Sequence, residues 1–123
     1  MQAKMIAGHE LTPGKTVKDH IHVEGTELHV PHVLLCGEQP GPTVLITAGI
    51  HNAEYVGIQA AIELSNELDV SMLRGNVILV PLVNRSGFEN RTMSRVFEDG
   101  KNLNRVFPGD REGSEAERLA HML

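Results

Sequence analysis

Two apolar runs on either side of one amphipathic segment constrain the fold of this chain more than any other feature. Residues 43–48 (TVLITA) and 77–83 (VILVPLV) are almost continuously apolar, which is typical of strands buried on both faces. Between them, residues 54–68 place their apolar side chains at helical spacing: Ile58, Ala61, Ile62 and Leu68. Strand, helix and strand in this order predict a right-handed βαβ unit over residues 43–83, and therefore an α/β fold.

The segment before this unit predicts antiparallel strands. Residues 15–23 and 26–36 are rich in β-branched residues and partly alternate, and the Glu-Gly pair between them is a turn signal. Residues 37–42 (GEQPGP) are a dense turn signal before the next strand. Pro81 lacks a ladder donor, so we expect it at a sheet edge or a bulge. Together these patterns predict a mixed sheet with flanking helices.

The turn that follows residues 43–48 carries a residue pair typical of a metal site. His51 and Glu54 in GIHNAEYVG are three positions apart, and residues at this spacing share a face once the chain turns helical. An imidazole and a carboxylate on one face can bind Zn²⁺, and a hydrolytic zinc site needs a third protein ligand, commonly from far away in the chain. The carboxyl end of a strand is also where α/β sheets place ligands. The alternative is an ordinary helix N-terminus, at which the helix dipole favours Glu54.

A second candidate region is the segment of residues 84–111, where hydrophobic periodicity is lost. Such a long segment in a compact domain is usually functional or disordered, and we interpret it as an active-site loop. It contains DGKNLNRVFPG, in which Asn104 and Arg105 offer an amide and a planar set of donors that suit the carboxylate of a small substrate. The alternative is an ordinary polar loop that ends in a Phe-Pro-Gly turn.

Residues 114–123 predict the start of a helix. Ser114 and Glu117 have the spacing of a capping box, and apolar residues follow at helical spacing. Because the sequence stops within this pattern, we expect residues 1–123 to be a single incomplete domain, with the antiparallel strands in residues 1–36.

The composition is that of an ordinary globular chain, with 41% hydrophobic residues, 22% charged residues and a net charge of −5. Basic residues are scattered and aromatic residues make up only 3%, so nucleic acid is not expected as a partner. Cys36 is the single cysteine and lies in an apolar run, which favours a buried thiol in a reducing compartment. No segment resembles a signal sequence or a membrane span, so we expect a cytoplasmic protein without a membrane partner.

Taken in order, four motifs resemble a known enzyme family. GIHNAEYVG, VILVPLVNRSGFENR, DGKNLNRVFPG and GSEAERLA together resemble the succinylglutamate desuccinylase and aspartoacylase family, which belongs with the zinc carboxypeptidases. The resemblance extends from about Pro31 to the end of the chain. It implies the amino-terminal part of a zinc-carboxypeptidase-like hydrolase domain.

The resemblance also implies roles for individual residues. His51 and Glu54 match the first two Zn²⁺ ligands of the family. Asn104 and Arg105 match its Asn-Arg pair, which grips the carboxylate of a small-molecule substrate. The implied reaction is zinc-dependent hydrolysis of the amide bond in an N-acyl amino acid or a similar substrate.

Other parts of the family site are open or absent. A further arginine upstream of the pair belongs to it, and we prefer Arg95 over Arg91. The third ligand, a His in an Asp-Leu-His motif, and the general base, a Glu, are expected beyond Leu123, so the chain as given is expected to be inactive. Asn52 and Ala53 stand where the family often has Gly and an acidic residue, which implies different hydrogen bonding around the ligands.

Three alternatives to the deacylase interpretation follow from the same residues. They are a zinc carboxypeptidase that acts on peptides, a non-catalytic fragment or binding module, and an α/β domain without a metal. His20 and His22 share a strand face and could bind a metal, but a solvated face is the favoured interpretation. We expect His121 to be a surface residue.

Overall fold

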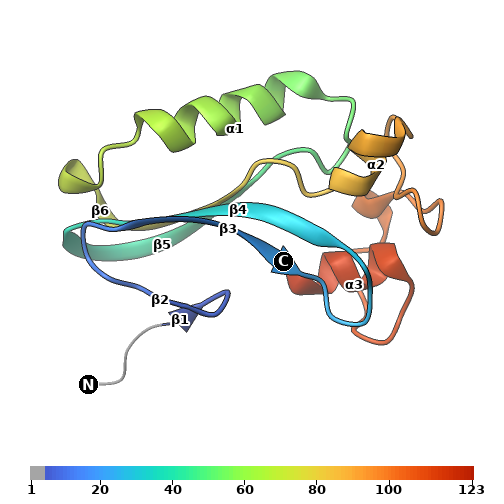
Figure 1. The fold of residues 1–123 in the computed structure, drawn as a ribbon, viewed down its shortest axis with the longest axis horizontal. Coiled ribbons are helices and arrows are strands. Elements are labelled where there is room, and N and C mark those ends of the chain that lie inside the picture. Colours follow the sequence, from blue (N-terminus) through green and yellow to red (C-terminus); the bar gives the residue numbers. More distant parts are fainter. Residues whose placement is uncertain (1–4) are drawn as a thin grey trace.

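The computed structural model describes residues 5–123, which form a mixed sheet with helices on both faces (Figure 1). In chain order the elements are β1 Met5–Ile6, β2 His9–Glu10, β3 Thr16–His22, β4 His29–Cys36, β5 Gln39–Thr47, α1 Tyr55–Glu67, the 3₁₀ turn η1 Val70–Met72, β6 Arg74–Val80, α2 Arg85–Asn90, the 3₁₀ turn η2 Leu103–Arg105 and α3 Glu115–Met122. None of the helices in this part of the chain is long and apolar enough to cross a membrane.

The larger sheet has the strand order β3-β4-β6-β5. β3 and β4 pair antiparallel from Thr16 opposite Leu35 to His22 opposite His29, which confirms the predicted pair of antiparallel strands. β4 pairs antiparallel with β6, and β6 pairs parallel with β5. Because α1 connects the two parallel strands, the predicted βαβ unit and the α/β fold class are confirmed.

Each face of the sheet packs against a different helix (Figure 1). On one face α1 covers a cluster of buried residues: Val33, Leu35, Ala61, Val77 and Leu79. On the other face α3 joins a second cluster: Val23, Leu28, Val30, Val80, Val83, Val96, Leu103, Ala116, Leu119 and Ala120. The central strands β4 and β6 contribute to both clusters, because successive side chains of a strand point to opposite faces.

β5 is not the strand buried on both faces that its apolar sequence predicted. It lies at the edge of the sheet, and within the described residues only β6 pairs with it. Val44 and Leu45 are 47% and 46% exposed. The apolar run indicates a strand but cannot show which neighbours the strand has. β5 also begins at Gln39, inside the predicted turn, and its pairing with β6 is irregular between Gln39 and Thr43.

The βαβ unit otherwise follows the prediction closely. α1 begins and ends within one residue of the predicted 54–68. β6 ends at Val80, so the predicted strand 77–83 lay too far toward the C-terminus. Pro81 follows the last residue of β6 and therefore removes no ladder donor.

The aperiodic segment contains a helix that the sequence did not predict. α2 has six residues, too few to show hydrophobic periodicity. Its N-cap residue is Asn84, whose side-chain oxygen accepts a hydrogen bond from the Gly87 N–H. The interpretation of residues 84–111 as one loop was wrong at this end. The remainder contains the short turn η2.

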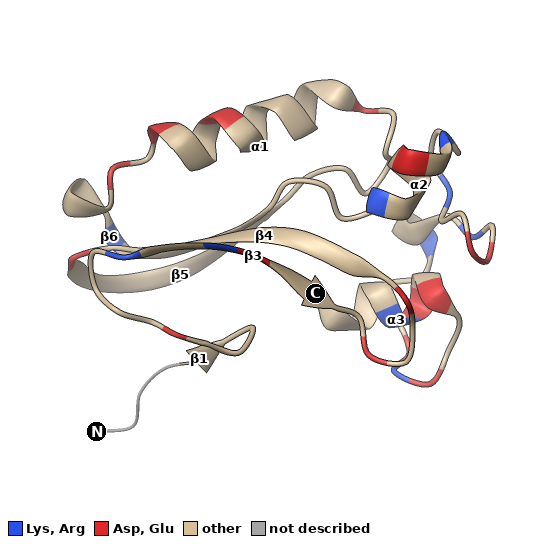
Figure 2. Cartoon of the chain, in the orientation of Figure 1, with Lys and Arg blue, Asp and Glu red and all other residues tan. Residues whose placement is uncertain are grey.

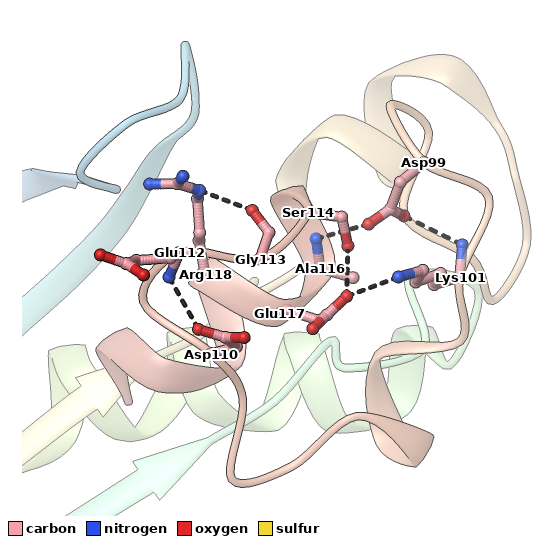
Figure 3. Close-up of polar contacts among 9 residues, drawn as sticks. All are labelled: Asp99, Lys101, Asp110, Glu112, Gly113, Ser114, Ala116, Glu117 and Arg118. Carbon is pink, nitrogen blue, oxygen red and sulfur yellow. Dashed lines mark hydrogen bonds and ion pairs between the residues drawn. The ribbon is translucent and has the colours of Figure 1, made fainter.

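α3 begins where it was predicted, but it is capped differently (Figure 3). Ser114 makes no side-chain bond to the helix backbone, and its hydroxyl donates to Glu117 Oε1 at 3.0 Å. Asp99, from the preceding loop, accepts the Ala116 N–H at 2.7 Å. Lys101 Nζ pairs with Glu117 Oε1 at 2.5 Å, which raises the pKa of Lys101 and lowers the pKa of Glu117. Ser114 and Glu117 therefore interact as the capping-box spacing predicted, but Asp99 and not Ser114 supplies the side-chain cap to the helix backbone.

Three smaller expectations can be compared with the structure. Cys36 is buried, and burial raises the pKa of its thiol. His20 and His22 are exposed, as expected of a solvated strand face, and His121 is also exposed. Lys and Arg residues are spread over the strands at one end of the sheet and the loops and helices at the other (Figure 2).

Candidate metal and substrate site

The site begins where the two parallel strands end. β5 and β6 run in the same direction, so the segments that leave them at Thr47 and Val80 meet at one edge of the sheet. Gly49 turns the chain away from β5 with φ +70°, a conformation that favours glycine. Its carbonyl accepts the Asn84 N–H at 3.0 Å, which fixes the two segments to each other.

His51 and Glu54 lie on this turn and point toward each other. The distance between His51 Nδ1 and Glu54 Oε2 is 3.2 Å. Glu54 is the N-cap residue of α1, but its side chain makes no hydrogen bond to the helix backbone. The carboxylate is thus directed at the imidazole and not at the helix backbone, while Glu54 also occupies the helix N-terminus at which the dipole favours an acidic residue. The His51 side chain is 27% exposed and that of Glu54 is 73% exposed.

Asn102 holds the other nitrogen of the imidazole. Its Oδ1 lies 3.0 Å from His51 Nε2 and also accepts the Asn104 N–H at 3.1 Å. Because an amide oxygen only accepts, Nε2 donates an N–H to Asn102 Oδ1, and Nδ1 is the ring nitrogen that faces Glu54 Oε2. A lone pair and a carboxylate oxygen repel each other unless a proton or a cation lies between them. The arrangement therefore provides two donor atoms suited to a metal ion.

Sequence analysis did not single out Asn102. It lies within the DGKNLNR motif, but an isolated Asn in a polar loop carries no signal that distinguishes it from its neighbours. Its contact with His51 joins residues 51 positions apart, and only the fold brings them together.

Asn104 and Arg105 lie in the turn η2, which Asn102 caps. Both are exposed, and within residues 5–123 the structure records no hydrogen bond or ion pair to the Arg105 guanidinium. Since Asn102 bonds both His51 and the backbone of this turn, the candidate carboxylate-binding pair is tied to the candidate metal pair through one amide.

The two upstream arginines occupy different surroundings. Arg95 forms an isolated β-bridge with Asn102, and its Nη1 donates to the Gly100 carbonyl at 3.1 Å. Arg91 ends α2 in the left-handed conformation with φ +57° and lines an open cavity of about 460 Å³ beside Asn52. Arg95 is thus joined to the residue that holds His51, whereas Arg91 faces open space.

The donor set for a metal is partial. Within residues 5–123, no three His, Cys, Asp or Glu side chains converge closely enough to hold a metal ion. His51 and Glu54 fit two positions of a zinc site, because their donor atoms converge and the imidazole is held by its other nitrogen.

Several known proteins are similar to this chain. An N-alpha-acetyl-L-2,4-diaminobutyric acid deacetylase from Halomonas elongata is 46% identical over 81 residues, which are 65% of this chain and 23% of that protein. The structure of an aspartoacylase family protein from Mesorhizobium loti matches with a TM-score of 0.80 and 34% identity, over 98% of this chain and 38% of that one. A product-bound ectoine utilization protein from Ruegeria pomeroyi matches with a TM-score of 0.77 and 27% identity, over 90% of this chain and 36% of that one.

The chain spans less than two fifths of each of these relatives. Residues 40–123 match the family model described as the succinylglutamate desuccinylase/aspartoacylase catalytic domain. This match includes α1, the His51 turn and the DGKNLNRVFPG loop. The chain belongs to the succinylglutamate desuccinylase/aspartoacylase family.

Proposed function

We propose that this chain forms the amino-terminal part of a zinc-dependent amidohydrolase that removes the acyl group from a small N-acyl amino acid. The observation that carries the proposal is the convergence of His51 Nδ1 and Glu54 Oε2 at 3.2 Å while Asn102 holds Nε2. Membership of a deacylase family and 46% identity to a deacetylase support the same reaction class.

Zn²⁺ bound by His51 and Glu54 would polarise the amide carbonyl and lower the pKa of water at the site. Asn102 Oδ1 accepts the Nε2 N–H of His51, which would leave Nδ1 as the donor atom for the metal. We also propose that residues outside this chain supply the third ligand and the general base.

Arg105 would bind the carboxylate of the substrate. Its planar guanidinium can donate two parallel hydrogen bonds to one carboxylate, and the structure leaves it exposed. Asn104 and Arg95 would complete the carboxylate site, because both lie next to the Asn102 contact. Such contacts orient the substrate amide relative to the metal. Buried Cys36 agrees with a reducing, cytoplasmic location, which we also propose.

The experiment is a substrate panel assayed with the full-length gene product that carries this sequence. Zinc content is measured by mass spectrometry, and hydrolysis is followed for N-acetyl-2,4-diaminobutyrate, N-acetylaspartate, N-succinylglutamate and a dipeptide. We expect about one zinc per chain and hydrolysis of an N-acyl amino acid but not of the dipeptide. Preference for the dipeptide would favour a carboxypeptidase, and full activity without metal would refute the proposal.

A further inference from the structure

A buried amide network joins the turn that carries His51 to the loop that carries Arg91 and Arg95. Its centre is Asn84, which has no exposed surface, and its partner Asn52 is 3% exposed. The sequence motifs assigned no role to Asn84, and they marked Asn52 only as a departure from the family pattern. Buried amides are costly unless their hydrogen bonds are satisfied, so the partners of Asn84 indicate what the network fixes.

Each polar atom of the Asn84 amide has a defined partner. Oδ1 accepts the Gly87 N–H at 3.1 Å, as the N-cap of α2. Nδ2 donates to Asn52 Oδ1 at 3.2 Å and to the Arg95 carbonyl at 3.0 Å. The two hydrogens of Nδ2 match these two acceptors, and a flipped amide would place an oxygen against both of them. The orientation of Asn84 is therefore fixed by three separate segments of the chain.

Thr92 and the backbone reinforce the same connection. The Thr92 hydroxyl lies 3.2 Å from Asn52 Oδ1 and also contacts the Arg95 carbonyl. The Ala53 N–H, two positions after His51, donates to the Met93 carbonyl at 2.8 Å. Residues 91–95, which we call the arginine loop, are thus joined to the His51 turn by several hydrogen bonds at and near the Asn84 side chain.

Gly87 provides the space for this network. A Cβ at this position would lie 2.6 Å from Asn84 Nδ2 and 2.7 Å from Thr92 Oγ1. Its φ is not positive, so glycine is needed for room and not for backbone conformation.

We propose that Asn84 is a positioning residue that keeps the arginine loop, residues 91–95, in register with the His51 turn. This proposal rests on the proposed function for its effect on catalysis, but the connection itself can be measured without any activity. Loss of the amide donor would leave the Asn52 and Arg95 oxygens without their buried partner, and the loop would separate from the turn.

The test uses two substitutions of Asn84 and a matched control. Asn84→Ser keeps a good N-cap for α2 but loses the amide donor, and Asn84→Ala loses both. Asn90→Ala is the control, because in the described part of the chain the Asn90 amide donates to the Ser86 carbonyl of its own helix, at 2.8 Å. Gly87→Ala is an independent variant that raises helix propensity yet places a methyl group against the network.

The first measurement is amide hydrogen exchange of the full-length gene product, followed at the amides of this sequence. In Asn84→Ser and Gly87→Ala we expect the Ala53 amide to exchange about 10-fold faster, while the Leu79 amide of β6 and the control variant stay unchanged. Equal acceleration at every amide would show a general loss of stability and would overturn the proposal, as would no change at Ala53.

The second measurement uses the full-length gene product on its best substrate. We expect Asn84→Ser to raise KM at least 5-fold with zinc content unchanged, because the arginine loop and not the metal pair is released. If the wild type shows no hydrolysis, the proposed function fails while the exchange experiment still decides on the network. Loss of zinc with normal KM in Asn84→Ser would contradict the positioning role.

Discussion

His51 and Asn102 are joined by a hydrogen bond of 3.0 Å from Nε2 to Oδ1, and this bond determines which imidazole nitrogen faces Glu54. The candidate metal pair, His51 and Glu54, and the Asn-Arg turn are consequently not independent, because Asn102 also accepts the Asn104 N–H. Changes to this one amide should affect both metal affinity and substrate binding.

Asn102→Ala should weaken zinc binding by the full-length gene product about 10-fold to 100-fold, the range typical of residues that orient metal-bound histidines. The measurement is zinc affinity by competition with a chelator. Asn102→Asp keeps an acceptor for His51 Nε2–H and should retain most of the affinity. If alanine and aspartate behave alike, the hydrogen bond does not determine metal affinity.

The 123-residue chain should bind zinc weakly and should not hydrolyse N-acyl amino acids, because two ligands make an incomplete hydrolytic site. His51→Ala and Glu54→Ala should each abolish the binding that calorimetry detects. His121→Ala is the control, since His121 is exposed on α3. Zinc affinity that survives His51→Ala would place the metal elsewhere, and clear hydrolysis by the chain would show that the site is complete.

Arg105→Lys should not be a conservative change in the full-length gene product. An ammonium cannot donate two parallel hydrogen bonds to one carboxylate, and loss of such a partner costs about 2 to 5 kcal/mol. We expect kcat/KM to fall roughly 30-fold or more with zinc content intact. A substrate whose carboxylate is replaced by a neutral amide should be poor for the wild type and little worse for the variant.

The stability of the chain should fall in mild acid because of His32. This residue is 2% exposed, neither ring nitrogen has a hydrogen-bond partner among residues 5–123, and burial lowers its pKa below the ordinary 6.5. The positive charge of His9 adds to this effect, Asp19 opposes it, and His20 adds a smaller lowering. Because the unfolded chain takes up the proton more readily, the stability is complete above about pH 6.5 and is lost as the pH falls below it.

Urea unfolding at pH 7.5 and 5.5 measures this loss. His32→Leu should reduce the difference between the two pH values, whereas His121→Gln should not. An unchanged difference in the His32 variant would assign the acid sensitivity to other groups.

Asp99→Ala should destabilise α3 by about 1 kcal/mol, the usual contribution of a side chain that caps a helix N-terminus. The reason is the bond from the Ala116 N–H to Asp99 Oδ2 at 2.7 Å. Ser114→Ala should cost less, since the Ser114 hydroxyl bonds Glu117 and not the helix backbone. Thermal unfolding measures both losses. A larger loss of stability in Ser114→Ala than in Asp99→Ala would show that Ser114 caps α3, as the capping box predicts.

Periodic features of the fold could be predicted from sequence, and non-local contacts could not. α1, the β3–β4 pair and the parallel pair follow from spacing and apolar runs, which act over a few residues. The exposure of β5 depends on the order of strands in the sheet, and six-residue α2 is too short for a periodic signal.

The same distinction holds at the candidate site. His51 and Glu54 are close in sequence, so their convergence could be predicted from spacing. Asn102 and Asn84 act through contacts 51 and 32 positions away, and a single Asn in a sequence does not indicate its partner.

The open edge of β5 also limits where a third metal ligand could enter. β5 ends at Thr47, shortly before His51, and within residues 5–123 no strand pairs with its outer edge. A strand added there in parallel would bring its own carboxyl end beside His51 and Glu54, whereas an antiparallel strand would bring its amino end. The direction of that added strand would therefore decide whether a missing ligand must follow or precede it in the polypeptide.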